Sequence, residues 1–302
     1  MGQNINQKNI TNDFRCGYVA IVGRPNVGKS SLINKLIGQP ISIISRRKQT
    51  TVDCILGVVN QNNLQLVLID TPGIEFNGKL VKSRRLNNLA TSILSDVDVI
   101  LWVIEAKKIH TEDELIPKIF PKNIPIVVAI NKVDLANSDN DKRKMFEQVN
   151  DLSDINIDVI IPISVSKSFQ ITQLIDEIKL RLPIRTPIFD KDFLTDKDIV
   201  FRTSEIIREK VFKLIGDELP YTTFIEIDRL LEEEVGRKIV TIDASIITNR
   251  MTHKPIVIGK KGMTIKRIKE DSLRPLRKLF DRPVKLNLWV KVRQKFIQKS
   301  SY

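Results

Sequence analysis

One segment constrains the fold of this chain more than any other: Gly23-Arg-Pro-Asn-Val-Gly-Lys-Ser30, which fits the pattern G-x-x-x-x-G-K-S/T. An apolar run, residues 18–22, precedes it, and a helix-forming run follows it. Between a strand and a helix, the two glycines let backbone N–H groups turn inward around a polyphosphate, while the lysine reaches the β and γ phosphates and the serine hydroxyl ligates Mg²⁺. The helix adds its positive dipole end. We therefore predict a phosphate loop at residues 23–30.

A second motif, Asp70-Thr-Pro-Gly73, directly follows the apolar run of residues 64–69. A buried strand would place this motif at its carboxyl end, at the same sheet edge as the phosphate loop. A carboxylate there can hold a Mg²⁺ ion through water, and the Gly73 N–H can bond a γ phosphate. Alone, these four residues would be interpreted as a turn. Their position after a second strand favours a nucleotide-sensing segment.

A third motif, Asn131-Lys-Val-Asp134, ends the apolar run of residues 126–130. Asp134 can accept hydrogen bonds from both N1–H and the exocyclic amine of guanine, and a base without this donor pair would leave the carboxylate unpaired. The first two residues of the motif would support the loop and flank the base. After one more strand, Ser164-Val-Ser166 would close over it. Three motifs in this order, each at a strand end, predict a guanine-nucleotide site.

With these motifs, the chain resembles the Era family, which belongs to the translation-factor-related GTPases. The resemblance rests on the form of the phosphate loop, on Ser45-Arg-Arg-Lys-Gln-Thr-Thr51 and on Asp70-Thr-Pro-Gly73, and it runs across most of the chain. It implies GTP and GDP as ligands, Mg²⁺ as cofactor and a switch I segment. That segment is Gln49, Thr50, Thr51, Val52 and Asp53.

The predicted GTP site gathers residues from four loops. They are Gly23, Arg24, Pro25, Asn26, Val27, Gly28, Lys29, Ser30, Asp70, Thr71, Pro72, Gly73, Ile74, Asn131, Lys132, Val133, Asp134, Ser164, Val165 and Ser166. For Mg²⁺, Ser30 is the predicted direct ligand, Thr51 joins it when GTP is bound, and Asp70 acts through water. Thr50 is the alternative to its neighbour Thr51.

The hydrolytic step lacks one group that Ras-like GTPases have. Ile74 stands where they carry the glutamine that orients the attacking water, so slow unaided hydrolysis is expected. The predicted catalytic residues are Asn26, Lys29, Thr51 and Gly73. Related GTPases with an asparagine at the position of Asn26 use it to help bind K⁺ beside the phosphates, so the resemblance implies K⁺ as a second cation. Glu75 is the alternative, as a general base, although the γ phosphate would repel it.

Apolar runs alternate with amphipathic helical stretches over residues 18–182. This alternation predicts a mostly parallel sheet with helices on both faces, which is the α/β fold of a P-loop GTPase domain. One of the helices is predicted over residues 112–119. The prolines of Pro183-Ile-Arg-Thr-Pro187 end the alternation and predict a linker.

The charge of the chain lies at its C-terminal end. Residues 1–243 hold 33 Lys and Arg against 33 Asp and Glu, whereas residues 244–302 hold 16 against 3, which accounts for the net charge of +13. A basic end on a neutral enzyme indicates a polyanionic partner. The alternative is a lysine-rich solvated surface. With two cysteines and two histidines in the chain, we expect no structural zinc site.

From residue 204 the pattern changes to helix, strand, strand, helix, helix, strand, with the first helix predicted over residues 204–215. In the strands predicted over residues 240–249 and 284–292, apolar residues alternate with polar ones and are predicted to face inward, with Trp289 facing outward. Between the middle helices, Ile258-Gly-Lys-Lys-Gly262 matches the G-x-x-G loop of a KH RNA-binding domain. The predicted RNA-binding residues are Gly259, Lys260, Lys261, Gly262, Lys266 and Arg267. The alternative is a basic helix over residues 263–280 that rests on an anionic membrane. Pro275 predicts a kink or break in that helix.

We therefore expect an α/β P-loop GTPase domain followed by an α+β type II KH domain. The boundaries are a flexible tail over residues 1–14, the GTPase domain over 15–182, a linker over 183–200 and the KH domain over 201–302. This order again resembles the Era family. It implies 16S rRNA and the small (30S) ribosomal subunit as partners, a role in subunit assembly and 16S rRNA 3′-end maturation, and a monomer.

The resemblance also implies a cytoplasmic setting, with weak peripheral association with the cytoplasmic face of the inner membrane. The alternative function is a nucleotide-gated RNA-binding or membrane-surface-binding module with little intrinsic hydrolysis. Single-turnover hydrolysis by the purified protein, with and without RNA, distinguishes the two functions.

Overall fold

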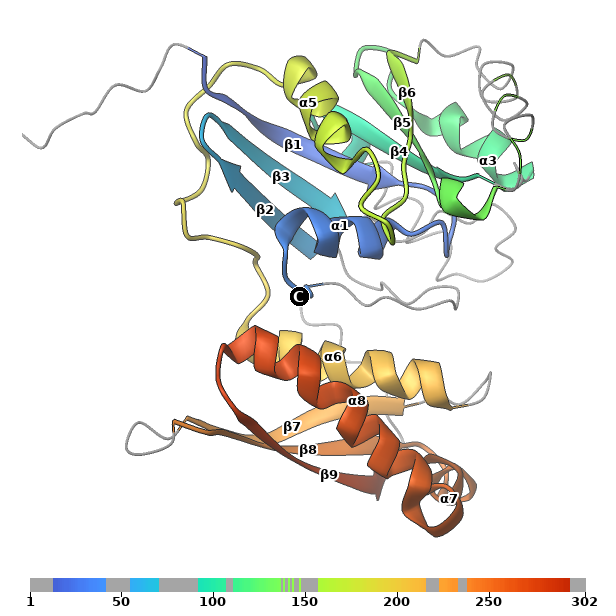
Figure 1. Ribbon diagram of the computed structural model, residues 1–302, viewed down its shortest axis with the longest axis vertical. Coiled ribbons are helices and arrows are strands. Elements are labelled where there is room, and N and C mark those ends of the chain that lie inside the picture. Colours follow the sequence, from blue (N-terminus) through green and yellow to red (C-terminus); the bar gives the residue numbers. More distant parts are fainter. Residues whose placement is uncertain are drawn as a thin grey trace, which may run out of the picture. The chain divides into compact units, whose positions relative to one another are not determined.

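The computed structural model describes the chain in several stretches. They are residues 13–41, 55–70, 92–106, 111–136, 138, 141, 143, 147, 157–215, 223–232 and 238–293. The described residues divide into two compact units, the first within residues 1–38 and 48–196 and the second within residues 39–47 and 197–302 (Figure 1). Each unit has its own sheet.

A six-stranded sheet forms the centre of the first unit. Its strands are β1 (Arg15–Val22), β2 (Ile55–Gln61), β3 (Leu64–Asp70), β4 (Val99–Glu105), β5 (Ile126–Asn131) and β6 (Val159–Pro162). The spatial order is β2-β3-β1-β4-β5-β6, and every neighbouring pair is parallel except the antiparallel hairpin of β2 and β3. The predicted mostly parallel sheet is confirmed. Its strands are continuous apolar runs because both faces are covered.

The described part of the first unit contains in full the helices α1 (Lys29–Ile37), α3 (Thr111–Leu115) and α5 (Ile171–Arg181). The single helix expected over residues 112–119 is divided, because α3 tightens into a 3₁₀ turn, Ile116–Ile119. Pro117 stands in that turn and has no N–H for an α-helical hydrogen bond, which accounts for the change. The ring of Phe120, the residue after this turn, packs edge to face on Trp102 of β4, with ring centroids 5.8 Å apart.

Residues 183–196, part of the linker expected from sequence, are hydrogen bonded to the first unit, at first beside the start of β1 and then along the open edge of β2. We call them the strap. Backbone hydrogen bonds of the strap join Cys16 N to Pro183 O (3.2 Å), Arg185 N to Phe14 O (3.1 Å) and Val58 N to Leu194 O (2.8 Å). At its end, the carboxylate of Asp196 accepts a hydrogen bond from Leu56 N (3.0 Å). The strap therefore reaches the first residues of β2.

A buried amide side chain holds the middle of the strap. Gln65, in β3, is 1% exposed. Its Oε1 accepts hydrogen bonds from Ile188 N (2.7 Å) and Phe189 N (2.9 Å), and its Nε2 donates to Phe189 O (2.8 Å). The same Nε2 donates to Asn60 Oδ1 (2.8 Å), and Asn60 Nδ2 donates to Lys191 O (2.8 Å). Gln65 and Asn60 thus fix the strap to the β2–β3 hairpin.

The second unit has the helix and strand order predicted for a type II KH domain. Its elements are α6 (Ile199–Leu214), β7 (Thr223–Glu232), β8 (Val240–Thr248), α7 (Lys254–Ile258), α8 (Met263–Phe280) and β9 (Val284–Val292). The sheet order is β7-β8-β9, with β7 antiparallel and β9 parallel to β8. Helices α6 and α8 cover one face of this sheet (Figure 1).

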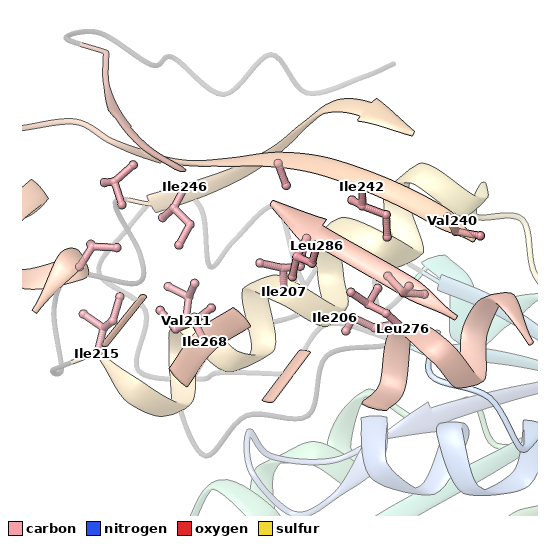
Figure 2. Packing of buried hydrophobic residues seen from close by; sticks show 14 residues of the cluster. Ile206, Ile207, Val211, Ile215, Val240, Ile242, Ile246, Ile268, Leu276 and Leu286 are labelled. Carbon is pink, nitrogen blue, oxygen red and sulfur yellow. The ribbon is translucent and has the colours of Figure 1, made fainter. Parts of the chain in front are cut away.

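An apolar core fills the space between these helices and the sheet. Figure 2 shows side chains from α6, α8, β8 and β9 pointing toward one another. The alternation predicted for β8 and β9 supplies one half of the core, since Ile242 and Leu286 are fully buried. Helix α8 contributes to the other half of the core, since Ile268, Ser272 and Leu276 are buried at four-residue intervals.

Two helices differ from the sequence expectation. Helix α6 begins at Ile199 instead of residue 204, because the carboxylate of Asp198 accepts a hydrogen bond from Phe201 N (2.6 Å) and caps the helix. Helix α8 continues through Pro275, so of the expected kink or break the break is wrong. The loss of one backbone hydrogen bond at a proline is offset here by the apolar face that α8 packs onto the sheet.

Candidate functional site

The phosphate loop joins β1 to α1 with a backbone that few residue types adopt. Gly23, Asn26 and Gly28 have positive φ angles of 149°, 70° and 107°. A Cβ atom on Gly23 would lie 2.2 Å from the carbonyl oxygen of Val103, and one on Gly28 would lie 2.3 Å from Nδ2 of Asn131. Both glycines are therefore required by close contact as well as by backbone conformation.

The ammonium group of Lys29 lies inside this loop. Its Nζ donates hydrogen bonds to the carbonyl oxygens of Gly23 (2.8 Å) and Arg24 (3.0 Å). Burial lowers the pKa of Lys29 to about 8, and the negative charge of Asp70 opposes this shift. A desolvated cation held by two backbone carbonyls is a strong attractor for phosphate oxygens, because an anion compensates the lost hydration.

Two oxygen groups that suit Mg²⁺ lie beside the loop. Ser30 Oγ, in the first turn of α1, donates to Oδ2 of Asp70 at 3.3 Å, and Asp70 is the fully buried last residue of β3. A hydroxyl and a carboxylate are hard ligands that fit Mg²⁺ together with phosphate oxygens and water. Thr51, the third predicted ligand, and its alternative Thr50 lie outside the described residues.

The amide of Asn131, at the end of β5, connects three loops. It is 2% exposed, and its Nδ2 donates to the carbonyl oxygen of Val27 in the phosphate loop (2.8 Å). Its Oδ1 accepts hydrogen bonds from Lys132 N (2.8 Å) and Val165 N (3.2 Å). The structure thus brings together the first and third motifs and the loop at Ser164.

Lys132 extends across the phosphate loop from the third motif. Its Nζ donates to the carbonyl oxygen of Asn26 (2.8 Å) and lies 3.1 Å from Oε2 of Glu105. The backbone of Lys132 is left-handed, with φ 65°. Glu105, the last residue of β4, was not predicted from sequence, because a carboxylate at a strand end carries no signal of its own.

Two hydroxyl groups orient the carboxylate of Asp134. Ser164 Oγ donates to its Oδ1 (2.6 Å) and Ser166 Oγ to its Oδ2 (3.1 Å). These hydrogen bonds, that of Ser164 foremost, hold the pKa of Asp134 below its usual value. Asp134 is exposed, so an ionised and oriented acceptor faces outward at the carboxyl ends of β5 and β6. Such a group can accept the two donors of guanine.

The structure gives one predicted site residue an unexpected position. The Arg24 side chain is buried and its Nε lies 2.7 Å from Oδ2 of Asp113 in α3, so the two side chains form an internal ion pair. Asp113 was not predicted, and only the fold brings it to the loop. Several predicted residues lie outside the described residues, and their roles stay predictions: Gln49, Thr50, Thr51, Val52, Asp53, Thr71, Pro72, Gly73 and Ile74.

In the second unit, the G-x-x-G loop lies between α7 and α8. Gly259, Lys261 and Gly262 have positive φ angles of 75°, 52° and 76°. A Cβ on Gly259 would lie 2.1 Å from Oγ1 of Thr264, whereas one on Gly262 would meet no atom within 4 Å. The side chains of Lys260 and Lys261 are exposed. The loop therefore offers open space and positive charge, as a phosphate backbone requires.

An open hollow of about 300 Å³ lies between α8 and β9. It is lined by Ile265, Lys266, Lys269, Asn287, Leu288 and Trp289. The Trp289 side chain is 48% exposed although it is large and apolar. An exposed indole next to lysines suits the stacking of an unpaired base and the neutralisation of its phosphate. In the sequence, Trp289 was predicted only as an outward residue of β9. Among the described residues, no helix combines the length and hydrophobicity that a membrane span needs.

Two family models match the chain. One, described as 50S ribosome-binding GTPase, matches residues 18–132, and the other, described as KH domain, matches residues 218–295. Among curated proteins, GTPase Era of Bordetella pertussis is 41% identical over 283 residues, which are 93% of each chain. GTPase Era of Bordetella petrii is 37% identical over 288 residues, covering 95% of this chain and 96% of its own.

Two solved structures resemble nearly the whole chain. An Aquifex aeolicus Era variant bound to GDP·AlF₄⁻ has a TM-score of 0.83 and 36% identity, covering 93% of this chain and 95% of its own. An Era in complex with MgGDPNP and nucleotides 1506–1542 of 16S ribosomal RNA has a TM-score of 0.84 and 35% identity, covering 95% of this chain and 96% of its own. The likeness therefore extends over both units.

The guanine assignment can be tested at Asp134. Asp134→Asn keeps the size of the side chain but replaces an accepting oxygen with a donating amide. We expect the Kd for GTP and for GDP to rise together, by about 100-fold or more, because the carboxylate no longer accepts both donors of guanine. Titration with fluorescent nucleotides measures this.

Xanthine nucleotides provide the control, since they carry an oxygen where guanine has its exocyclic amine. The variant should bind them better than the unaltered protein does. A variant that keeps its affinity for GDP would contradict the assignment of Asp134 to the base.

Proposed function

The chain belongs to the Era family of GTPases, and on that premise we propose that it is a GTP-hydrolysing switch that binds 16S rRNA and assists assembly of the small (30S) ribosomal subunit. One observation carries the proposal. A guanine-nucleotide site and a basic G-x-x-G loop occur in one chain, and 95% of this chain matches an Era solved in complex with MgGDPNP and nucleotides 1506–1542 of 16S ribosomal RNA. The proposal includes 16S rRNA 3′-end maturation.

In the nucleotide-binding unit, each described site residue has its own chemical role. Lys29 binds the β and γ phosphates, Ser30 ligates Mg²⁺ directly and Asp70 holds it through water. Asp134 selects guanine. When bound, Mg²⁺ supplies positive charge where the γ phosphate leaves.

The hydrolytic step requires another positive charge, and we assign Asn26 to a K⁺ site beside the phosphates. Two features support this assignment. Asn26 is exposed at the outer turn of the phosphate loop, and its carbonyl oxygen is hydrogen bonded to Lys132 Nζ, which fixes its backbone. Backbone groups of Thr51 and Gly73 are the proposed partners of the attacking water. A cation at this place would act as an arginine finger does.

In the RNA half, Gly259 and Gly262 let the phosphate backbone approach, while Lys260 and Lys261 neutralise it. Lys266 and Arg267, both exposed in the first turns of α8, extend the positive surface. The hollow beside Trp289 would take an unpaired base. The target is single-stranded RNA near the 3′ end of 16S rRNA.

The strap supports coupling between the two halves. Ile55, the first residue of β2, pairs with Asp70, so the ends of the β2–β3 hairpin adjoin both switch segments in the sequence. The end of the strap is bonded to Leu56, and α6 begins at Ile199, three residues after Asp196. We therefore propose that the hairpin passes the nucleotide state through the strap to the RNA-binding unit, so that hydrolysis times the release of RNA.

Membrane association, a cytoplasmic setting and the monomeric state stay predictions. The feature that favours peripheral membrane contact is a group of exposed apolar side chains close in sequence to the basic loop. They are Met251 (65% exposed), Ile256 (52%) and Met263 (62%). Apolar side chains beside lysines suit an anionic lipid surface, whose binding would compete with RNA.

The K⁺ proposal predicts a salt effect on turnover. Replacing K⁺ with Na⁺ at constant ionic strength should lower kcat by about tenfold or more, since the smaller ion fits the same ligands poorly. Asn26→Ala should remove most of this dependence, and its residual rate should be equal in the two salts. Equal turnover of the unaltered protein in K⁺ and Na⁺ contradicts the proposal.

The RNA proposal predicts separable sites. The double variant Lys260→Asp, Lys261→Asp should weaken binding of an oligonucleotide from the 3′ end of 16S rRNA by about 100-fold or more, with GTP affinity within about twofold. Fluorescence anisotropy measures the affinity for the oligonucleotide, and nucleotide titration measures the affinity for GTP.

A matched control changes the same charge elsewhere: Lys118→Asp with Lys122→Asp, two exposed lysines of the first unit. If the control loses RNA binding equally, Lys260 and Lys261 act only through the net charge of the protein. The assignment of RNA binding to the G-x-x-G loop is then wrong. Cosedimentation of the same proteins with anionic vesicles tests the membrane alternative. That alternative requires the unaltered protein to bind the vesicles in the absence of RNA.

The coupling proposal predicts an effect of Gln65→Leu, which keeps the volume of the buried side chain but removes its hydrogen bonds to the strap. We expect the ratio of RNA Kd values between the GTP-analogue and GDP states, about 5-fold or more for an ordinary coupling, to fall toward one. GDP affinity should stay within about threefold, and the exposed Gln173→Leu should leave the ratio unchanged. A normal ratio in Gln65→Leu removes the strap from the coupling.

A further inference from the structure

The side chain of Arg24 forms an ion pair with a carboxylate outside the phosphate loop. It leaves the phosphate loop between β1 and α1 and is 9% exposed, with its Nε 2.7 Å from Oδ2 of Asp113. The Asp113 side chain is fully buried in α3. Arg24 Nη2 is also buried and has no hydrogen-bond partner among the described residues. Asp113 is therefore the anion that compensates this guanidinium inside the protein.

The phosphate loop is supported from outside at several residues. Gly23 lies against the backbone of β4, the Asn26 carbonyl is held by Lys132, and the Val27 carbonyl is held by Asn131. Arg24 adds a further support, an ion pair with a different element, α3. The contacts at Asn26 and Val27 hold peptide carbonyl groups directly, whereas the contact at Arg24 holds the loop through a side chain.

The peptide that Arg24 anchors binds the lysine that acts on the phosphates. The carbonyl oxygen of Arg24 accepts a hydrogen bond from Lys29 Nζ at 3.0 Å, next to that of Gly23 at 2.8 Å. Lys29 has a long and flexible side chain, so these two carbonyls decide where its ammonium group lies. A shift of either carbonyl would move the ammonium relative to the transferred phosphate.

Charge makes this anchor sensitive to the loss of one partner. Arg24 and Lys29 are two cations buried within a few residues of each other, and Asp113 neutralises the first of them. Without the carboxylate, the guanidinium would remain buried and unpaired, which is strongly unfavourable. It would move toward water or toward the phosphates, and the carbonyl of Arg24 would move with it.

We propose that Asp113 is a positioning residue for GTP hydrolysis, which holds the buried guanidinium of Arg24 and thereby fixes the carbonyl oxygen that places the Lys29 ammonium. Asp113 touches neither nucleotide nor metal in this role. It acts through Arg24, and α3 becomes part of the catalytic framework. A purely structural ion pair is the competing explanation, and it would affect stability alone.

Asp113→Asn is the first test, because it keeps the shape and one acceptor oxygen but removes the charge. We expect kcat for GTP to fall by about 10- to 100-fold, as small misplacements of catalytic groups do, while KM changes by less than about threefold. Asp113→Glu, which restores the charge, should recover part of the lost kcat. Steady-state and single-turnover hydrolysis measure both values.

A second variant separates positioning from stability. Arg24→Met with Asp113→Leu replaces the pair with apolar side chains of similar volume, an exchange that often restores or raises stability. Positioning predicts that its melting temperature returns to about that of the unaltered protein while kcat stays low. If kcat recovers together with the melting temperature, the pair is structural and the proposal is wrong.

Asp98→Asn serves as the control for loss of an ion pair remote from the site. Asp98 precedes β4 at the amino end of the strand, where it pairs with Arg185 of the strap. Its loss should lower stability with kcat unchanged within about twofold. A fall of kcat in this control as large as in Asp113→Asn would also overturn the proposal, because it would show that any lost ion pair slows the enzyme.

Discussion

The buried ammonium group of Lys29 is the constraint on which the GTPase unit depends. A cation out of water needs compensation, and the fall of its pKa to about 8 reflects how much hydration it has lost. Two carbonyl oxygens compensate part of that loss, and phosphate oxygens can compensate the rest. Left-handed glycines, the amide of Asn131 and the ion pair of Arg24 all serve to keep these carbonyls in place.

Both units use the same physical device for a phosphate group. Gly28 precedes helix α1 and Gly262 precedes α8, each with a left-handed backbone and, within the described chain, no side-chain cap. The N–H groups of the first turn are thus available to a ligand instead of a capping side chain. One loop suits a nucleotide and the other an RNA backbone, and lysines supply the charge in both.

The sequence predicted what is encoded locally and missed what depends on distant contacts. The alternation of β9, the start of α1 and the two glycine loops depend on neighbouring residues, so their patterns were sufficient. Asp113 lies 89 residues from its partner Arg24, and Gln65 lies 124 residues from Phe189, so neither contact leaves a pattern in the sequence. The continuity of α8 through Pro275 likewise depends on packing against the sheet, which the residues around the proline do not reveal.

The strap has a consequence for the behaviour of the protein in a crowded solution. Strand β2 is the last strand on its side of the sheet, and an uncovered edge of seven residues would be a template for strands of other chains. Val58 and Leu56 instead donate to the strap, and the opposite edge, β6, is only four residues long. A strap that loosened in one nucleotide state would expose this edge, so the same hydrogen bonds protect the molecule from aggregation.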